Sequence, residues 1–518
     1  MWAALPPLDW WPLAWIAPIP WLLLARLERL PGRRPYAALW LAGFVFWMAA
    51  LHWLRLPHWA TSFGWVALSF YLAFYIPVFV GLVRVGIHRL HWPLALVAPV
   101  VWTGLELVRA YLLTGFSMGS LSHTQSRWLA LIQISDVTGG YGVSFVVMLV
   151  AAALAGVWPP AKRRAWAAVP VAALAVVACL TYGAQRMQPP TDARGPQIAL
   201  IQGSIDTMFD GDPERTDRIL AQYRALTAQA LKASPNAALV VWPESMYPHG
   251  WLTAEADADG GPDHPAFTAG QLRAFAEDSR EGIERLAREV GLPMVVNAGR
   301  QHVSAGGRVD FFNTAILVDP QRGIVAWYDK MHPVMFGEYI PFGGWLPWLY
   351  RLTPLQGGLT PGAQAKAFPV AGLTACPSVC YETVLPQVIR RQVRQLEEQG
   401  TPSDFLLNVT NDGWFWGSSE LEMHLVCSVF RAVEMRKPLL IAANTGISAA
   451  IDGDGRILAR GPRRAQTTLT PHVQPDGRHS FYRRWGDWFA GGCLAITGVI
   501  AAVGTRQAFR SAPFSVSA

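Results

Sequence analysis

The stretch VVWPES at residues 240–245 joins a short apolar run to a proline and then to the carboxylate of Glu244. An apolar run bounded in this way predicts a buried strand that ends just before the acid. Two further stretches also lie at the ends of predicted strands: YDKMH at 328–332 contains Lys330, and CPSVCYE at 376–382 contains Cys380. The sequence therefore predicts a domain that carries an acid, a lysine and a cysteine at the ends of its strands.

The residues around these stretches alternate between strand and helix patterns, which predicts a layered α/β domain. Residues 313–318 and 324–328 flank the turn sequence DPQRG at 319–323 and predict a hairpin. Residues 253–270, rich in Asp, Gly, Ala and Pro, predict an irregular surface loop. The other expected elements are strands at 197–202, 238–242, 294–297 and 405–409, and helices near 214–232, 280–290, 386–399 and 420–436.

The rest of the chain has the composition of a membrane protein. Of its 518 residues 52% are hydrophobic and 15% are charged, and 24 are tryptophan. Apolar runs of about 17 to 25 residues are long enough to cross a bilayer. Seven such runs predict a transmembrane helical bundle, at about 10–26, 37–54, 64–84, 92–110, 138–158, 165–183 and 487–505.

Basic residues are concentrated in every second loop of this predicted bundle. The net charge of +7 could suggest nucleic acid, but many basic residues lie in short loops, so we interpret them as topology determinants and expect no nucleic-acid partner. By the positive-inside rule the basic loops are cytoplasmic and the region 190–480 is periplasmic. The alternative is that one or two runs are buried soluble helices. The basic loops contain Arg26, Arg29, Arg33, Arg34, Arg84, Arg89, Lys162, Arg163, Arg164, Arg506 and Arg510, and the opposite loops contain Arg55 and Arg127.

The pattern divides the chain into three parts. We expect a bundle of about six spans at 1–188, a catalytic domain at 196–475 and a final transmembrane helix at 485–506. The five cysteines have no spacing typical of a zinc site or of a disulfide framework. Cys179 and Cys493 lie in apolar runs, where a cysteine usually packs as a small hydrophobic residue.

Each of Glu244, Lys330 and Cys380 has an ordinary explanation when it is taken alone, as a solvated acid, a surface lysine and a packing cysteine. Together they resemble the nitrilase superfamily. The resemblance implies that Glu244 is a general base, that Lys330 stabilises the oxyanion and that Cys380 attacks a carbonyl to form a thioester. A thiol is mostly protonated near neutral pH, so it needs a base or a nearby cation. A cation placed where negative charge develops stabilises the transition state.

The whole chain resembles the apolipoprotein N-acyltransferase family, with the spans, the catalytic domain and the last helix in the same order. The resemblance implies a helical bundle plus an αββα sandwich, with Glu338 and Glu382 as supporting acids and Tyr381 beside the nucleophile. The chain departs from the family's pattern at two places. The segment 6–24 resembles the family's second span rather than its first, and residues 206–211 are DTMFDG where the family often has Lys and Trp. Further matching segments are 113–116, 337–341, 380–382, TNDGWF at 410–415, RAVE at 431–434 and NTGIS at 444–448.

The resemblance also implies the reaction. A phospholipid of the bacterial inner membrane would give an acyl chain to Cys380, and the N-terminal amine of a diacylglyceryl-cysteine apolipoprotein would accept it. The reaction would need no metal or organic cofactor, and a monomer would suffice. Two alternatives remain, a membrane-tethered amidase that hydrolyses small amides and a catalytically silent scaffold.

Aromatic residues near the expected membrane surface are candidates for contact with the acyl chains. The candidates are Trp414, Phe415, Trp416, Phe342 and Trp345. They would line one cavity that serves donor and acceptor in turn. Tryptophan is also enriched at membrane interfaces as an anchor, which is the alternative explanation for these residues.

Overall fold

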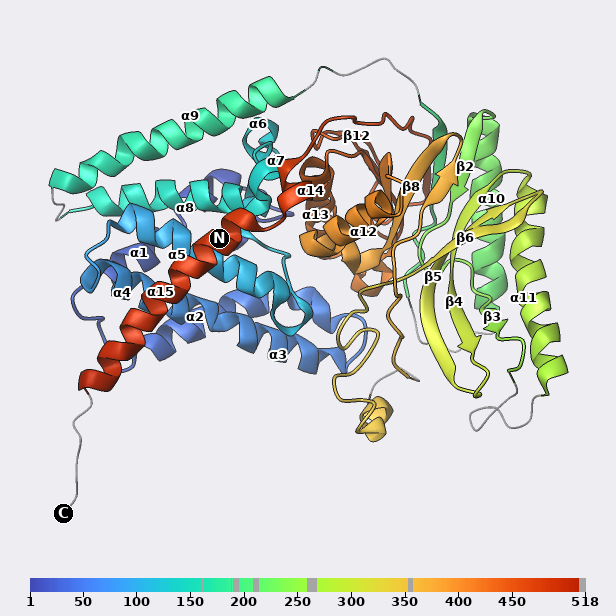
Figure 1. Ribbon diagram of the computed structural model, residues 1–518, viewed down its shortest axis with the longest axis horizontal. Helices are drawn as coiled ribbons and strands as arrows, with labels where there is room; N and C mark the ends of the chain where they lie inside the picture. The colour runs from blue at the N-terminus through green and yellow to red at the C-terminus, as the bar shows by residue number, and fades with distance from the viewer. Residues whose placement is uncertain are drawn as a thin grey trace. The chain divides into compact units, whose positions relative to one another are not determined.

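The computed structural model describes residues 1–159, 163–187, 189, 195–207, 214–258, 268–352 and 357–511 (Figure 1). The chain forms two compact units. Unit 1 comprises Met1–His52, Phe63–Gln188 and Ser480–Ala518, and unit 2 comprises Trp53–Ser62 and Pro189–His479. Lys162 and the tetrapeptide 208–211, on which two of the sequence predictions depend, lie outside the described residues.

Unit 1 is helical. Five of its described helical stretches are long and apolar enough to cross a membrane: Thr61–His88, Leu94–Thr114, Gly140–Val157, Arg163–Arg186 and Trp488–Arg506. The α-helices are α1 Ile19–Arg26, α2 Pro35–Ala50, α3 Thr61–Ala73, α4 Tyr75–His88, α5 Leu94–Tyr111, α6 Leu129–Ile132, α7 Ser135–Thr138, α8 Gly140–Val157, α9 Ala168–Arg186, α14 Phe481–Trp485 and α15 Trp488–Ser511. The short 3-10 helices of unit 1 are η1 Trp2–Ala4, η2 Trp11–Trp15, η4 Leu112–Thr114, η5 Leu121–Gln125 and η6 Arg163–Ala167, and η3 His52–Arg55 lies where the chain passes from unit 1 to unit 2.

The first apolar run, at 10–26, does not form the single helix that we expected. It divides into the 3-10 helix η2 and the eight-residue helix α1. Pro18 lies at the N-cap of α1 and Pro20 within its first turn. Because proline has no N–H and disfavours a helical residue before it, a helix starts at such a position more readily than it continues through it.

Unit 2 contains two β-sheets. The first has seven strands in the order β13-β1-β2-β4-β5-β6, with β3 paired to β4, and the second has the order β12-β11-β10-β9-β8-β7. The strands are β1 Gln197–Gln202, β2 Ala237–Val241, β3 Trp251–Ala254, β4 Met294–Val303, β5 Val309–Asp319, β6 Gly323–Asp329, β7 Phe368–Val370, β8 Leu373–Val379, β9 Phe405–Asn411, β10 Leu439–Asn444, β11 Ala449–Ile451, β12 Ile457–Arg460 and β13 Thr467–Leu469. The predicted hairpin is confirmed, because β5 and β6 pair antiparallel.

Alternation along the strands builds the layers of unit 2. Ile198 and Leu200 of β1 pack in one core cluster with residues of the second sheet, such as Phe405. Ala199 and Ile201 point to the opposite face and pack with Tyr223 of helix α10 (Arg215–Ala233). Successive side chains of a strand point to opposite faces, so each inner strand contributes to two cores.

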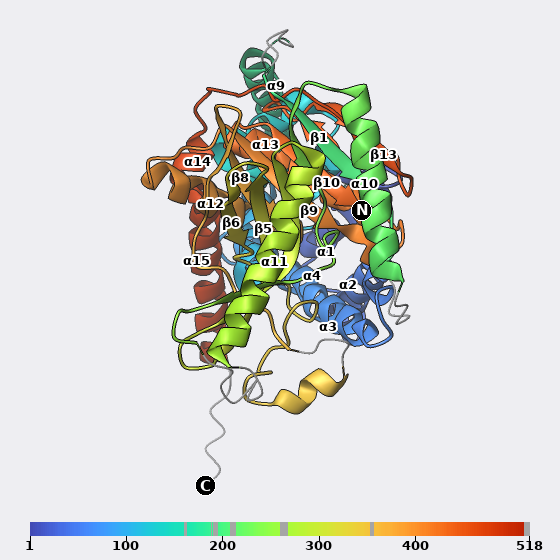
Figure 2. The same cartoon turned by 90° about the vertical axis from the view of Figure 1, so that its right-hand side faces the viewer.

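Helices cover the outer face of each sheet, which confirms the predicted αββα sandwich. Figure 1 shows α10 and α11 beside the first sheet and α12 and α13 beside the second, and Figure 2 shows α10 and α11 from the front. These helices are α10 Arg215–Ala233, α11 Ala269–Val290, α12 Pro386–Glu398 and α13 Glu420–Met435, and the 3-10 helices are η7 Pro347–Leu352, η8 Cys380–Val384 and η9 Asp412–Phe415.

The sequence prediction placed the start of α11 too late. The helix begins at Ala269 rather than near 280, and strand β3 takes up the start of the loop predicted at 253–270. Thr268 and Gln271 form a capping box, a signal for a helix start that the loop-like composition obscured. Residues 259–267 of that loop are outside the described residues.

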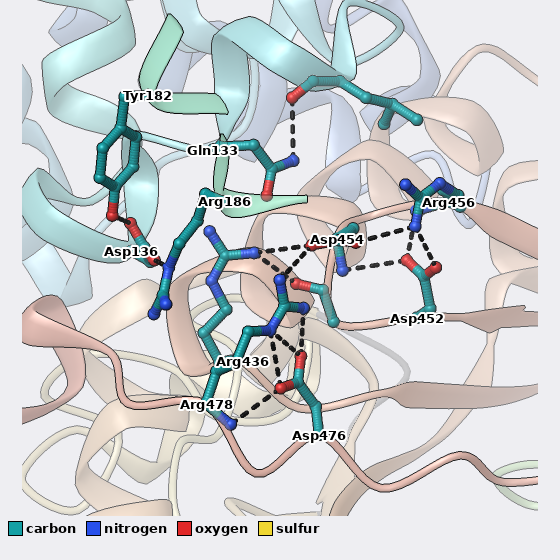
Figure 3. Close-up of polar contacts among 12 residues, drawn as sticks. Gln133, Asp136, Tyr182, Arg186, Arg436, Asp452, Asp454, Arg456, Asp476 and Arg478 are labelled. Carbon is teal, nitrogen blue, oxygen red and sulfur yellow. Dashed lines mark hydrogen bonds and ion pairs between the residues drawn. The ribbon is translucent and has the colours of Figure 1, made fainter. Parts of the chain in front are cut away.

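Buried polar clusters hold segments together inside each unit (Figure 3). In unit 1, Asp136 accepts hydrogen bonds from Tyr182 Oη and Arg186 Nε, each at 2.7 Å. In unit 2, Asp454 Oδ1 accepts one from Arg436 Nη1 at 3.0 Å and one from Arg478 Nη1 at 2.6 Å. The Arg436 side chain has no exposed surface, so its charge depends on this contact and its neighbours.

The unit 2 cluster leads to a stability prediction. Replacement of Asp454 by Asn leaves buried arginine charge without its carboxylate, which we expect to destabilise unit 2 by about 3–5 kcal/mol. Thermal unfolding of the purified full chain, followed by circular dichroism, measures the loss. Glu398→Gln removes a surface pair with Arg394 and should change stability by less than about 1 kcal/mol. Equal melting of both variants would contradict the assigned role of the cluster.

Candidate active site

Three strand ends carry the acid, the lysine and the cysteine predicted from the sequence. Glu244 follows β2, Lys330 directly follows β6, and Cys380 directly follows β8. The first two come from one sheet and the third from the other. Lys330 is 2% exposed and Glu244 is 5% exposed. The charges of Glu244 and Lys330 both act on the pKa of the half-buried Cys380 thiol, so the fold brings the three side chains into one site.

Two asparagines fix the carboxylate of Glu244. Asn313 Nδ2 donates a hydrogen bond to Glu244 Oε1 at 2.7 Å, and the backbone N–H of Asn411 donates one to Oε2 at 2.9 Å. The Asn313 side chain is itself held by Asn297, whose Nδ2 donates to Asn313 Oδ1 at 2.7 Å. The sequence reasoning assigned no role to Asn313, because a single asparagine inside a strand gives no motif.

Burial raises the pKa of Glu244 above that of an ordinary glutamate. The ammonium of Lys330 opposes this shift, and the carboxylate of Glu338 adds to it. A base whose pKa is raised towards neutrality takes a proton more effectively than an ordinary carboxylate does. The site therefore has the environment that a catalytic carboxylate base needs.

Lys330 is paired with Glu338, which the sequence identified as a supporting acid. Lys330 Nζ donates to Glu338 Oε1 at 2.8 Å, and the backbone N–H of Val334 donates to Oε2 at 2.8 Å. Burial alone would lower the pKa of Lys330, but Glu338, Cys380 and Glu244 raise it above its ordinary value. Lys330 is therefore a fixed cation at physiological pH.

Cys380 has an unusual backbone. Its φ is +52°, in the left-handed region that a residue other than glycine rarely adopts, at a cost of about 1–3 kcal/mol. The strand ends at Val379, so the side chain of Cys380 does not continue the alternation of β8. Burial and the charge of Glu244 raise the pKa of the thiol, while Lys330 and a hydrogen bond with Thr410 oppose the shift. The resting thiol is protonated and needs a base.

Glu382, the second supporting acid, connects the segments that carry the lysine and the cysteine. Its Oε1 accepts from Tyr328 Oη at 2.7 Å and from the backbone N–H of Met331 at 2.9 Å. Its Oε2 accepts from the backbone N–H of Val379 at 2.8 Å. Burial raises the pKa of Glu382. The ring of Tyr381, beside the nucleophile, stacks on His332 with the ring centroids 6.4 Å apart.

A second buried group of polar side chains lies behind the cysteine. Asp412, Glu420 and His424 place a nitrogen and carboxylate oxygens within 4.8 Å of one another, the donor types that bind divalent metals. His424 Nδ1 is 3.2 Å from Asp412 Oδ1, and Thr410 Oγ1 donates to the same oxygen at 2.9 Å. The sequence reasoning quoted 410–415 as a motif without assigning these roles, and His424 carried no signal inside its helix.

The aromatic candidates for lipid contact are partly or largely exposed. Phe342 is 70% exposed, Trp345 84% and Trp416 48%, and Trp414 is of intermediate burial. The ring of Phe415 packs edge-on against Trp53, with the centroids 4.9 Å apart. Exposed aromatic side chains of this kind suit an apolar or interfacial environment.

Two family models match this chain. Residues 197–482 match the carbon-nitrogen hydrolase family, and residues 1–153 match the apolipoprotein N-acyltransferase N-terminal domain. Among solved structures, an amidase of the nitrilase superfamily from Nesterenkonia AN1 has a TM-score of 0.38 at 18% identity, over 57% of this chain and 95% of the amidase. Nit3 of Saccharomyces cerevisiae, also of the nitrilase superfamily, has a TM-score of 0.38 at 15% identity, over 57% and 95%.

The relatives match along most of the chain. The apolipoprotein N-acyltransferase of Geobacter metallireducens is 35% identical over 96% of this chain and 91% of its own length. That of Rhodopirellula baltica is 32% identical over 95% of this chain and 93% of its own length. The resemblance predicted from the sequence is confirmed, and the chain belongs to the apolipoprotein N-acyltransferase family.

Proposed function

We propose that this enzyme transfers an acyl chain from a membrane phospholipid to the N-terminal amine of a diacylglyceryl-cysteine apolipoprotein through a thioester on Cys380. The observation that carries the proposal is the group formed by the buried Glu244 and Lys330 and the half-buried Cys380, in a chain that also contains five described helices long and apolar enough to cross a membrane. The triad provides the acyl chemistry, and the apolar helices suit substrates that reside in a bilayer.

In the first half-reaction, Glu244 takes the thiol proton as the sulfur of Cys380 attacks the carbonyl carbon of the phospholipid ester. A carbon–sulfur bond forms and the carbonyl oxygen becomes an oxyanion. As the intermediate collapses, the ester carbon–oxygen bond breaks and Glu244 returns the proton to the leaving oxygen. A lysophospholipid departs and the acyl chain remains on sulfur.

The second half-reaction uses the same groups in the same places. The amine of the apolipoprotein attacks the thioester carbon, and Glu244 accepts a proton from the nitrogen. The carbon–sulfur bond breaks and the sulfur of Cys380 recovers the proton from Glu244. Lys330 faces the oxyanion in both halves, and Glu338 together with the Val334 N–H holds the geometry of this cation.

With a small amide as the donor and water as the acceptor, the same residues would make the enzyme an amidase, which is the competing function. A hydrolase of small soluble amides has no need for apolar helices of membrane-spanning length. The apolar helices of unit 1 therefore favour lipid substrates. We include Phe342, Trp345, Trp414, Phe415 and Trp416 in the proposal as residues that guide acyl chains or lie in the membrane interface.

The proposal places the enzyme in the bacterial inner membrane, as a multi-pass protein with parts 1–188, 196–475 and 485–506 and with its catalytic domain in the periplasm. The basic loops between the apolar runs support this orientation. One copy of the chain supplies all three triad residues, so a monomer is sufficient for the reaction.

The nucleophile is tested by replacing Cys380 and Cys376 separately with alanine. Cys376 is buried in β8, and burial raises its pKa to about 12, so it is a packing residue and a poor nucleophile. We expect Cys380→Ala to abolish the thioester, detected by mass spectrometry of protein incubated with phospholipid, and Cys376→Ala to retain it. A thioester that persists in Cys380→Ala and is lost in Cys376→Ala would reverse the assignment.

The pH dependence of thioester formation tests the base. Glu244 must be ionised to accept a proton, and burial raises its pKa, so the rate should rise with pH through a midpoint above about 4.3, the value of free glutamate. Glu338→Gln removes one charge that raises this pKa, so its midpoint should move to lower pH. Its maximal rate should fall roughly 10- to 100-fold because Lys330 loses its partner. Glu281→Gln, which changes a surface pair, should leave the midpoint in place, and an unmoved midpoint in Glu338→Gln would contradict the assignment.

The orientation is tested by reporter fusions. Truncation fusions of a periplasm-active enzyme at about residue 160 and about residue 300 should be inactive and active, respectively, because the first point lies in a basic loop and the second in the catalytic domain. A cytoplasm-active reporter at the same points should give the opposite signals. Equal signals at both points would overturn the orientation.

A further inference from the structure

The backbone carbonyl of Cys380 is held by three side chains. Asn408 Nδ2 and Thr383 Oγ1 each donate a hydrogen bond to it at 3.3 Å, and His424 Nε2 lies 3.3 Å away. The same residue has the positive φ described above. A strained backbone persists only where its surroundings over-determine it, so these contacts have a mechanical role.

His424 links this carbonyl to Asp412. The imidazole is buried on α13, with Nδ1 3.2 Å from Asp412 Oδ1 and Nε2 2.9 Å from Thr383 Oγ1. Nε2 also lies 3.3 Å from the Cys380 carbonyl oxygen, so the ring is placed between this carbonyl and the carboxylate of Asp412. Three carboxylates lie near the ring on the elements packed around it: Asp412, Glu420 on the same helix at 3.8 Å, and Glu244.

Three consecutive residues at the end of β9 contact both the base and the nucleophile. Thr410 hydrogen-bonds the thiol of Cys380, the backbone N–H of Asn411 donates to Glu244 Oε2, and Asp412 holds His424. The thiol and the carbonyl of Cys380 are thereby both connected to Asp412, one through Thr410 and the other through His424.

We propose that His424, oriented by Asp412, is a positioning residue that holds the Cys380 carbonyl and so directs the thiol towards Glu244 and Lys330. The proposal rests on the proposed thioester chemistry of Cys380. Burial, the largest single effect, lowers the pKa of His424, whereas Asp412, the carbonyl of Cys380 and Glu244 together raise the pKa above that of free histidine. An imidazole that carries a proton on Nε2 can donate a hydrogen bond to the Cys380 carbonyl oxygen.

The test measures two reactions of Cys380 in the purified full chain. One is thioester formation from phospholipid, and the other is alkylation by iodoacetamide as a function of pH, which needs no acyl transfer. In His424→Ala, thioester formation should slow roughly 10- to 100-fold with little change in the KM for phospholipid, because the thiol is misdirected and lipid binding is intact. His424→Gln, whose amide N–H reaches towards the carbonyl, should recover most of the rate.

Alkylation separates positioning from a merely structural role. Asp412 raises the pKa of the Cys380 thiol, and loss of the imidazole leaves this carboxylate uncompensated. The alkylation midpoint of His424→Ala should therefore move to higher pH. The double variant Asp412→Asn with His424→Ala should bring the midpoint back, while thioester formation stays slow.

The matched control is His472→Ala. His472 Nδ1 lies 2.8 Å from the backbone carbonyl of Gly195, a contact of the same kind before strand β1. The His472→Ala variant should leave both the thioester formation and the alkylation of Cys380 unchanged.

Four results would overturn the proposal. They are a wild-type thioester rate in folded His424→Ala, an unmoved alkylation midpoint in that variant, an equal loss in His472→Ala, and a divalent metal that copurifies stoichiometrically with the wild type and is lost in His424→Ala. The last result would make Asp412, Glu420 and His424 a metal centre instead. A wild-type protein that alkylates normally but forms no thioester would refute the proposed function and leave the alkylation test of His424 intact.

Discussion

The burial of the Lys330 ammonium is the constraint on which the active site depends. An ion of this size loses several kcal/mol of hydration when it is buried, and only nearby opposite charge and hydrogen bonds offset that loss. Glu338 supplies the contact at 2.8 Å, and its second oxygen is held by the Val334 N–H. The loop that follows β6 must therefore fold back on Lys330, which fixes the path of the chain from 330 to 338.

The site forms only when the two sheets are correctly packed against each other, because each sheet contributes part of it. Glu244 and Lys330 come from the first sheet, and Cys380 comes from the second. Glu382 accepts hydrogen bonds from the backbone N–H groups of Met331 and Val379. The backbone N–H of Asn411, at the end of β9, donates a hydrogen bond to Glu244. These bonds cross between the layers, where apolar packing is non-directional and cannot set an atom's position by itself.

The sequence was sufficient to predict the strand ends and the three residues placed there. An apolar run bounded by proline or by charged residues can be identified as a strand from its hydrophobic pattern and its length alone. Asn313 and His424 could not be found in this way, because their role arises from partners far away in the chain, Glu244 at 69 positions and Cys380 at 44. Prolines divide the apolar run 10–26 into two helices, and a capping box starts α11 earlier than we expected. A hydropathy value averaged over many residues does not detect either of these local signals.

The charge balance of the site suits the proposed reaction, whose steps move one negative charge among neighbouring atoms. With Glu244 and Glu338 ionised, Lys330 charged and the thiol neutral, the group carries one negative charge. Proton transfer from Cys380 to Glu244 moves that charge from carboxylate to sulfur, and attack on an ester moves it again to the carbonyl oxygen. The total never changes, and Lys330 acts on both of the first two positions. A charge that moves within reach of a fixed cation needs little new solvation, so the dry surroundings that raise the pKa of Cys380 and Glu244 are compatible with fast chemistry.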